Sequence, residues 1–235
     1  MTTKIVFFDM MGTLVHFAPE PEDLLVAAAA ERGIPIDIRD ARRGFATAGE
    51  WWNRQTARQA IMTDAERDAS YTDFDVRVLR AVGVDVEPSV ARSLLDSLIS
   101  ESGKPTLSLY DDVLPALSIL RDRNVRMGII SNIGRELPNI VEALGIAAYF
   151  DVLVSSAAAG YAKPDPRIFE WGIRQAAVQP NEAAHVGDQY ENDVLGAKGA
   201  GVQPVLVDRY GLLEDKTDCI RVESLTMVYE ALANL

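Results

Sequence analysis

The sequence predicts an α/β fold, a doubly wound, mainly parallel sheet interrupted by a small α-helical bundle. Short apolar runs of strand length alternate with helical patterns, as in parallel sheets. The first strand-like run covers residues 4–8, and the next does not begin until Val125. A normal connection from strand to helix is only a few residues long, so a folded segment is expected between these two runs. With 235 residues, the chain is long enough for one large domain or two smaller ones.

The segment between the two runs has the pattern of four helices, predicted at 22–32, 37–55, 63–82 and 87–100. The first helix is expected to end at Gly33, and the third begins with the capping-box sequence Thr63-Asp64-Ala65-Glu66. Helices of this size with one apolar side form a small bundle. We therefore expect a core domain of residues 1–17 and 104–235 and an inserted helical domain of residues 18–103. The linkers are expected near 15–21 and 102–109.

The rest of the chain alternates between predicted helices and strands. The predicted strands lie at 125–130, 150–154, 183–186 and 204–207, and the predicted helices at 111–123, 137–144, 166–177, 194–200 and 224–233. Strands that alternate with helices in this way form a parallel sheet with helices on both faces.

Polar residues follow several of the predicted strands. Asp9 comes directly after the first strand, Ser131-Asn132 after the second and Gly187-Asp188 after the run at 183–186. Because the carboxyl ends of neighbouring parallel strands meet at one crevice, we expect these side chains to converge. Lys163, in the stiff sequence Lys163-Pro164-Asp165-Pro166, and Asp193 are expected to join them.

These four motifs, in this order and at this spacing, resemble those of the haloacid dehalogenase superfamily from Lys4 to about Val207. The resemblance implies a Rossmann-like core, with residues 18–103 as a cap that closes over the site and selects the substrate. It implies a hydrolase in which Asp9 attacks the substrate and Mg²⁺ is the cofactor. The implied catalytic residues are Asp9, Thr13, Ser131, Asn132 and Lys163. The implied metal ligands are Asp9, Asp188, the backbone carbonyl of Met11 and Asp193, the last either directly or from the outer shell.

One position departs from the pattern of the family. Phosphatases of this superfamily carry a second Asp two residues after the nucleophile, where it acts as general acid and base. Here that residue is Met11, which can neither give nor take a proton. Three functions remain open: a metal-dependent phosphatase, weak because of Met11; a 2-haloacid dehalogenase, whose halide leaves without a proton; and a phosphate-binding relative without turnover. The phosphatase is preferred because it alone uses Asp188 and Asp193.

Two histidines and the aromatic and basic residues of the insert are further candidates for roles in the site. His16 is expected to be a partly exposed hinge residue, with proton donation as the alternative. His185 lies within a predicted strand and is expected to be structural. Trp51 and Trp52 are expected to pack in the helical insert, with contact to the substrate alongside Arg42, Arg43 and Arg54 as the alternative.

Composition excludes several classes of partner. The net charge is −12 and no run of Lys and Arg occurs, so neither nucleic acid nor an anionic membrane is an expected partner. We expect a small, anionic substrate. The single cysteine, Cys219, cannot form an internal disulfide, and the chain begins without a secretory leader, so a cytoplasmic location is expected. The oligomeric state is not predicted.

Overall fold

The chain forms two compact units in the computed structural model, which describes residues 3–54, 63–101 and 106–234. Unit 1 comprises Met1–His16 and Ser108–Leu235, and unit 2 comprises Phe17–Leu107. The chain passes between the units along two strands, β2 (Val15–Ala18) and β3 (Thr106–Leu109), which pair with each other.

The pairing of β2 with β3 has an antiparallel sense. Tyr110 donates its N–H to the carbonyl of Leu14 (3.2 Å), and the hydroxyl of Thr106 lies 3.4 Å from the carbonyl oxygen of Ala18. Linkers without strands were expected here, because a run of only four residues is too short to mark a strand. The connection is instead a paired ribbon.

Unit 1 is built on a six-stranded sheet in which every pair of neighbours is parallel, and this confirms the predicted fold class. In spatial order the strands are β5 (Val152–Ser155), β4 (Arg126–Ser131), β1 (Ile5–Phe8), β6 (Ala183–Gly187), β7 (Gln203–Val207) and β8 (Ile220–Val222). The chain runs outward from β1 to β5, then returns to β6 and runs outward on the other side. The direction of winding therefore changes between β1 and β6, where doubly wound sheets form their crevice.

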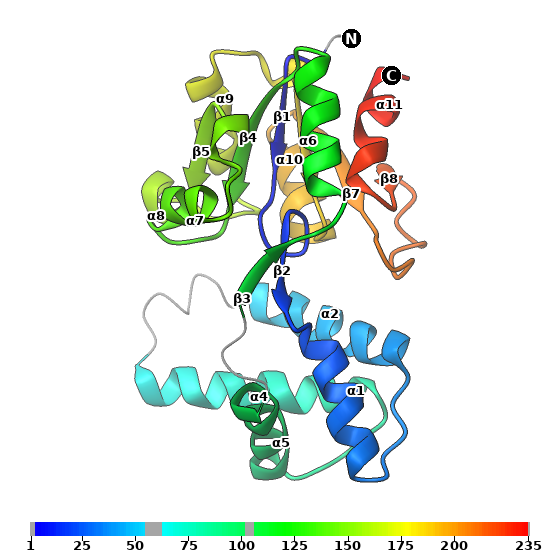
Figure 1. Cartoon of the computed structure of the whole chain (residues 1–235). Coiled ribbons are helices and arrows are strands. Elements are labelled where there is room, and N and C mark those ends of the chain that lie inside the picture. The colour runs from blue at the N-terminus through cyan, green and yellow to red at the C-terminus, as the bar shows by residue number, and fades with distance from the viewer. Residues whose placement is uncertain (1–2, 55–62, 102–105, 235) are drawn as a thin grey trace. The chain divides into compact units, whose positions relative to one another are not determined.

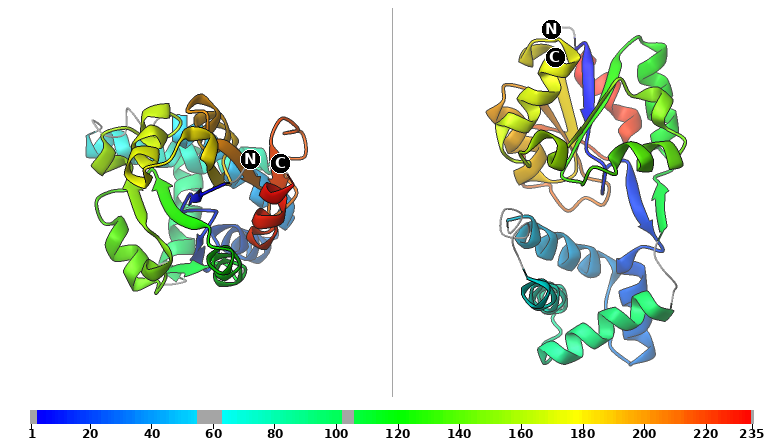
Figure 2. Two further views of the ribbon diagram at one scale, coloured as in Figure 1. Left: turned by 90° about the horizontal axis from the view of Figure 1, so that it is seen from above. Right: turned by 90° about the vertical axis from the view of Figure 1, so that its left-hand side faces the viewer.

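Both faces of the sheet are covered by helices (Figures 1 and 2). Helices α6 (Val113–Asp122) and α11 (Val228–Ala233) lie on one face, and α9 (Pro166–Ala176) and α10 (Gly196–Gly199) on the other. All four residues of β1 are buried, as expected for a central strand between two helical layers. The core on the α9 side includes Phe7, Ile130 and Phe169, all fully buried. The sheet therefore holds the end of β1 rigidly.

Unit 2 is helical in the part that the structure describes. Its helices are α1 (Pro21–Glu31), α2 (Ile38–Arg54), α4 (Asp64–Ala81) and α5 (Pro88–Glu101). They enclose a separate core that includes Leu25, Ala48 and Leu79. Helix α4 starts with the expected capping box, in which Thr63 and Glu66 each accept a hydrogen bond from the other's backbone N–H. Of the described helices, none combines the length and apolarity needed to cross a lipid bilayer.

Two elements of unit 1 differ from the sequence prediction. The helix expected at 194–200 begins earlier, as a π-helical turn η3 (Tyr190–Leu195) that leads into α10. Strand β8 was not predicted, because its three residues have a charged residue, Arg221, at the centre. The short elements that complete unit 1 are α7 (Leu137–Ala143), α8 (Ser156–Ala159), η1 (Ala147–Tyr149), η2 (Pro180–Glu182) and η4 (Leu225–Met227).

Candidate active site

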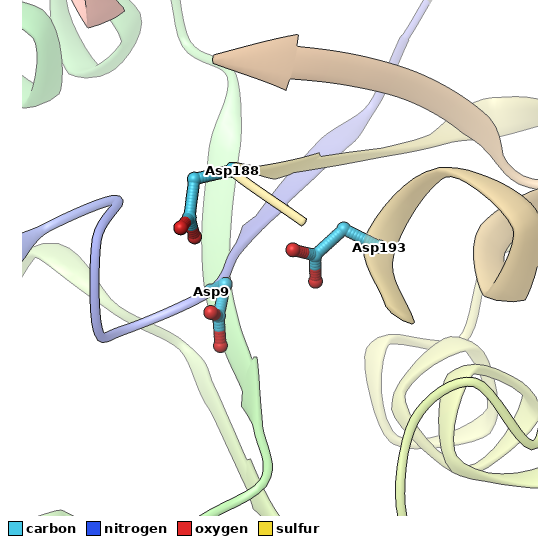
Figure 3. Close-up of side chains that lie close together, drawn as sticks. All are labelled: Asp9, Asp188 and Asp193. Atoms are coloured by element: carbon cyan, nitrogen blue, oxygen red, sulfur yellow. The ribbon is translucent and has the colours of Figure 1, made fainter. Parts of the chain in front are cut away.

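Three carboxylates converge at the carboxyl ends of β1 and β6 (Figure 3). Asp9 follows β1 directly, Asp188 follows β6 and Asp193 projects from η3. One oxygen from each lies within 4.8 Å of the others. Asp9 and Asp193 are buried, whereas Asp188 remains partly exposed. The prediction that strand ends bring these residues together thus agrees with the geometry.

Two glycines allow the backbone to approach these carboxylates closely. Gly12, in the turn after Asp9, has a φ of 76°, in the left-handed region that favours glycine. A Cβ at Gly12 would lie 2.2 Å from a carboxylate oxygen of Asp188, and a Cβ at Gly187 would lie 2.1 Å from the carboxylate carbon of Asp193. Both distances are shorter than any van der Waals contact. Glycine at each position is therefore a requirement of the site.

Lys163 is the cation of the site. Its ammonium lies 2.6 Å from Oδ1 of Asp9 and 2.6 Å from Oδ1 of Asp193, and the side chain is buried. The side chain of Asn132 holds its backbone: the Asn132 amide oxygen accepts from the N–H of Lys163 (2.7 Å) and the amide nitrogen donates to its carbonyl (2.9 Å). The motif after β4 thus fixes the position of the lysine loop.

Asp193 is engaged by three donors. Its Oδ1 accepts from Lys163 and lies 2.9 Å from Nε2 of His185, and its Oδ2 accepts from the backbone N–H of Gln189 (3.0 Å). His185 is fully buried in β6 and was expected to be only structural. A polar ring in the middle of a strand covered on both faces needs a partner, and this was the signal for its contact with the site.

The charges of the cluster shift the pKa values of its members in different directions. Desolvation by burial raises the pKa of Asp9, although Lys163 opposes it. The pKa of Asp188 lies well above its usual value because of desolvation and the nearby charges of Asp9 and Asp193. Burial alone would raise the pKa of Asp193, but Lys163 and His185 outweigh it and the pKa is lowered. Lys163 has a raised pKa because the two carboxylates outweigh its burial.

These shifts indicate where positive charge is lacking. Lys163 offsets the charge of Asp193 and part of that of Asp9, whereas the ionised form of Asp188 remains disfavoured. Its Oδ1 accepts a hydrogen bond from the hydroxyl of Thr13 (3.1 Å), which is a neutral partner. All the atoms that could bind a metal here are oxygens, the ligands preferred by hard divalent cations such as Mg²⁺. The residues therefore fit such a cation between Asp9 and Asp188.

The other predicted residues lie around this cluster. Met11 lies in the turn after Asp9, and within the described ranges its carbonyl takes part in no hydrogen bond. Ser131 is the last residue of β4 and is buried beside β1. The ring of His16 stacks on Tyr110 with centroids 4.6 Å apart.

The tryptophans of unit 2 take part in packing. Trp52 stacks on Tyr71 (4.9 Å between centroids) and meets Phe74 edge-on, and the Arg77 guanidinium lies 4.4 Å from the centre of a Trp51 ring. The side chain of Arg54 lies outside the described part of the structure.

Comparison with known protein families decides the relationship that the motifs indicate. A family model described as haloacid dehalogenase-like hydrolase matches residues 3–201. The chain belongs to this family.

Relatives of this haloacid dehalogenase-like hydrolase are named for different activities. The human "Haloacid dehalogenase-like hydrolase domain-containing protein 3" is 28% identical over 87% of this chain and 81% of its own length. The "Glyceraldehyde 3-phosphate phosphatase" of Methanopyrus kandleri is 32% identical over 92% of this chain and 89% of its own. The solved structure of a 2-haloacid dehalogenase from Pseudomonas syringae pv. Tomato DC3000 aligns with a TM-score of 0.58 at 25% identity, covering 100% of this chain and 99% of that one.

In this family member, one further set of contacts reaches the candidate site. Arg209, two residues after β7, donates to the carbonyl of Thr13 and to Oδ2 of Asp112, each at 2.7 Å. The sequence analysis did not select Arg209. Its only signal is that it belongs to a charged pair, Asp208-Arg209, directly after a buried strand.

Proposed function

We propose that this hydrolase is a metal-dependent phosphatase that acts on phosphate esters of small molecules through a covalent intermediate on Asp9. The observation that carries the proposal is the second carboxylate, Asp188, placed beside Asp9, where desolvation and the neighbouring carboxylates outweigh the attraction of Lys163. Such a carboxylate would repel an anionic substrate unless a cation lies between them. The name of the Methanopyrus kandleri relative supports the same class of reaction.

In the proposed reaction the Asp9 carboxylate attacks phosphorus, and the bond from phosphorus to the leaving oxygen breaks. Water then attacks phosphorus, which releases orthophosphate and restores the carboxylate. Lys163, charged because its pKa is raised by the two carboxylates, favours the ionised form of Asp9 against the effect of burial and stabilises charge on the transferred group. Asn132 keeps Lys163 in place through its backbone.

Asp9, Asp188 and the carbonyl of Met11 would hold Mg²⁺ in this site. Asp193 is proposed to act from outside the ligand shell, because three donors already occupy its oxygens. When bound, the cation would neutralise charge between the carboxylates and the phosphate group. Thr13 orients Asp188 through the hydrogen bond to Oδ1.

Met11 determines which esters are good substrates. General acid catalysis typically contributes about 10²–10⁴-fold, and the contribution is largest for basic leaving groups. Aryl and acyl phosphates leave readily without a proton, whereas alkyl phosphates do not. We therefore propose activated esters as the preferred substrates, with unit 2 acting as the cap that selects among them.

A dehalogenase is the second candidate, and Met11 is the observation that favours it. Halide leaves without protonation, so hydrolysis of a 2-haloacid needs no acid at this position. Asp188 speaks against it, because a second carboxylate beside Asp9 repels the carboxylate of the haloacid and has no step to perform.

One panel of assays separates the candidates. Phosphate release is measured from p-nitrophenyl phosphate, acetyl phosphate and a sugar phosphate, and chloride release from 2-chloropropionate, each with Mg²⁺ and with EDTA. The proposal expects Mg²⁺-dependent phosphate release that is lost in Asp9→Asn. Chloride release in EDTA would establish the dehalogenase instead. If the protein binds phosphate but forms no product from any of these compounds, it is a phosphate-binding member of the family without catalytic activity.

A further inference from the structure

We propose that Arg209 is a positioning residue for the metal site, acting through Thr13 on Asp188. The metal part of this inference rests on the proposed function, and the positional part rests on contacts within unit 1. Arg209 is outside the four motifs, and neither the family match, which ends at residue 201, nor the motif pattern assigns it a role.

The contacts join Arg209 to Asp188 through a single residue. Nη2 of Arg209 donates to the carbonyl of Thr13 (2.7 Å), and the hydroxyl of Thr13 donates to Oδ1 of Asp188 (3.1 Å). Thr13 is fully buried with Arg209 in place, so its carbonyl depends on this guanidinium as its donor. A buried carbonyl that loses its donor is costly, and the loop would move to regain one. Such a movement would carry the Thr13 hydroxyl away from Asp188.

Arg209 is itself held from two sides. Its Nη1 donates to Oδ2 of Asp112 (2.7 Å), and this oxygen also accepts from Ser224 Oγ and from the N–H of Leu225, both at 2.8 Å. On the other side its guanidinium lies 4.0 Å from the ring centre of Tyr110. The side chain is only 12% exposed, so its position is determined by packing as well as by hydrogen bonds.

The shape of the arginine side chain suits this role. A planar guanidinium can donate in two directions while it stacks on an aromatic ring, and an ammonium cannot do all three. Arg209→Lys is therefore expected to keep the charge but to restrain the Thr13 carbonyl less well than arginine does. Arg209→Met removes the charge and both hydrogen bonds.

Arg221→Met provides a matched control. Arg221 is also partly buried and pairs with an aspartate, Asp208, at 2.7 Å, and in the described part of the chain it makes no contact with Thr13. Each variant removes one positive charge from unit 1. This loss should strengthen the attraction for a cation, so weaker Mg²⁺ binding in Arg209→Met cannot be an effect of charge.

The first measurement is hydrogen exchange of metal-free protein, followed in the peptide that covers residues 9–16. In this loop the N–H groups of Gly12, Leu14 and Val15 are hydrogen-bonded within the loop itself. Arg209→Met should exchange faster here than both wild type and Arg221→Met, and Arg209→Lys should lie in between. Equal exchange in Arg209→Met and wild type would overturn the positional inference, whether or not the protein binds a metal.

The second measurement is the Kd for Mg²⁺ by calorimetry, below the melting temperature of each variant. Arg209→Met should bind Mg²⁺ about 10-fold more weakly, the lower end of the effect of removing an outer-shell partner, because Arg209 acts on Asp188 through such a partner, Thr13. A Kd equal to that of Arg221→Met would overturn the link to the metal while the proposed function stood. A wild type that binds no Mg²⁺ would overturn the metal part of both proposals, and exchange alone would then decide the positional part. Should Arg209→Met not fold, Arg209→Lys is compared with Arg221→Lys by the same two measurements.

Discussion

Met11 lies two positions after Asp9, where phosphatases of the family carry an acid. Its thioether cannot protonate a leaving group, yet its backbone remains available in the turn after β1. The side chain and the main chain of one residue therefore have separate consequences. A substitution here changes proton transfer and leaves the proposed carbonyl ligand in place.

Met11→Asp should raise the rate of phosphate release, and most of all for alkyl phosphates. The new carboxyl can protonate an alkoxide leaving group, a step worth up to about 10²–10⁴-fold. The measurement is kcat/KM for an alkyl and an aryl phosphate, with Met11→Asn as the control that adds polarity without a titratable proton. Rapid hydrolysis of a sugar phosphate by the wild type would contradict this account, with His16 as the first alternative donor to test.

Asp188→Asn should make the metal-free protein more stable and also abolish Mg²⁺ binding. The carboxylate of Asp188 is destabilised by desolvation and by the charges of Asp9 and Asp193, and the amide carries no such charge. We expect a gain of about 1 kcal/mol or more in the free energy of unfolding in EDTA at pH 7. Asp151→Asn, at an exposed ion pair with Arg126, is the control and should change stability by less than about 1 kcal/mol. A less stable Asp188→Asn protein would show that the charge is compensated without a metal.

At the scale of elements, the π-helical turn η3 and the end of β6 together hold Asp193. The N–H of Gln189 binds the side chain of Asp193, and the N–H of Asp193 binds the carbonyl of Gln189. The wider π turn brings this carboxylate back against Gly187, whereas the sequence predicted a helix that begins only at residue 194. Such turns are frequent at functional sites.

Gly187→Ala should therefore damage the site as well as the fold. Its Cβ would lie 2.1 Å from the carboxylate carbon of Asp193, so Asp193 must move and its contact with Lys163 must loosen. We expect a loss of about 1–3 kcal/mol of stability by thermal or urea unfolding and a fall in kcat. Gly199→Ala, in helix α10, is the control: the nearest atom to its new Cβ would be Cβ of Pro166, 3.7 Å away, and it should be neutral or stabilising. Full activity in Gly187→Ala would mean that the position of Asp193 is not critical.

At the scale of the whole molecule, the two units have separate cores. Leu79→Ala removes a fully buried side chain from the core of unit 2 and should cost about 2–5 kcal/mol of the stability of that unit. Because the three carboxylates and Lys163 all belong to unit 1, the Kd for Mg²⁺ at low temperature should stay unchanged. Calorimetric unfolding together with metal titration tests both statements. A loss of Mg²⁺ affinity that accompanies the loss of stability in Leu79→Ala would show that the site depends on the folding of unit 2.

Asp112 joins distant parts of unit 1, and its contribution should depend on pH. Burial alone would raise its pKa, but hydrogen bonds from Arg209, Leu225 and Ser224 outweigh this and lower it below the ordinary 3.8. Stability from this group is present above about pH 4 and is lost as the pH falls through the lowered pKa. Asp112→Asn should then cost about 1–3 kcal/mol at pH 7, and this cost should shrink toward pH 3. Urea unfolding at both pH values tests this, and a cost that did not change with pH would assign it to packing.

The sequence was sufficient to predict where the main strands lie along the chain, that they form a parallel sheet, and that their ends converge. Apolar runs with a polar residue after them identify β1, β4 and β6, and parallel strands necessarily bring their carboxyl ends together. The contacts of Arg209 and His185 were not predictable in the same way. The contacts of Arg209 depend on the approach of residues far apart in the chain, and no periodic pattern marks them. His185 lies near Asp193 in the chain, and its polarity within a buried strand indicated that it needs a partner but not which one. Strand β8 was missed because an edge strand of three residues leaves almost no pattern.

The paired ribbon of β2 and β3 has a consequence for the order of folding. In the sheet, β1 pairs with β4, its neighbour on one side, across the whole insertion. Loop closure over so long a stretch slows the pairing of strands. Thr106 and Ala18 meet in the ribbon although they are 88 positions apart, so once unit 2 is folded the effective separation of β1 and β4 becomes short. A destabilised unit 2 should therefore delay the refolding of unit 1, even though the core residues described for unit 2 all belong to that unit.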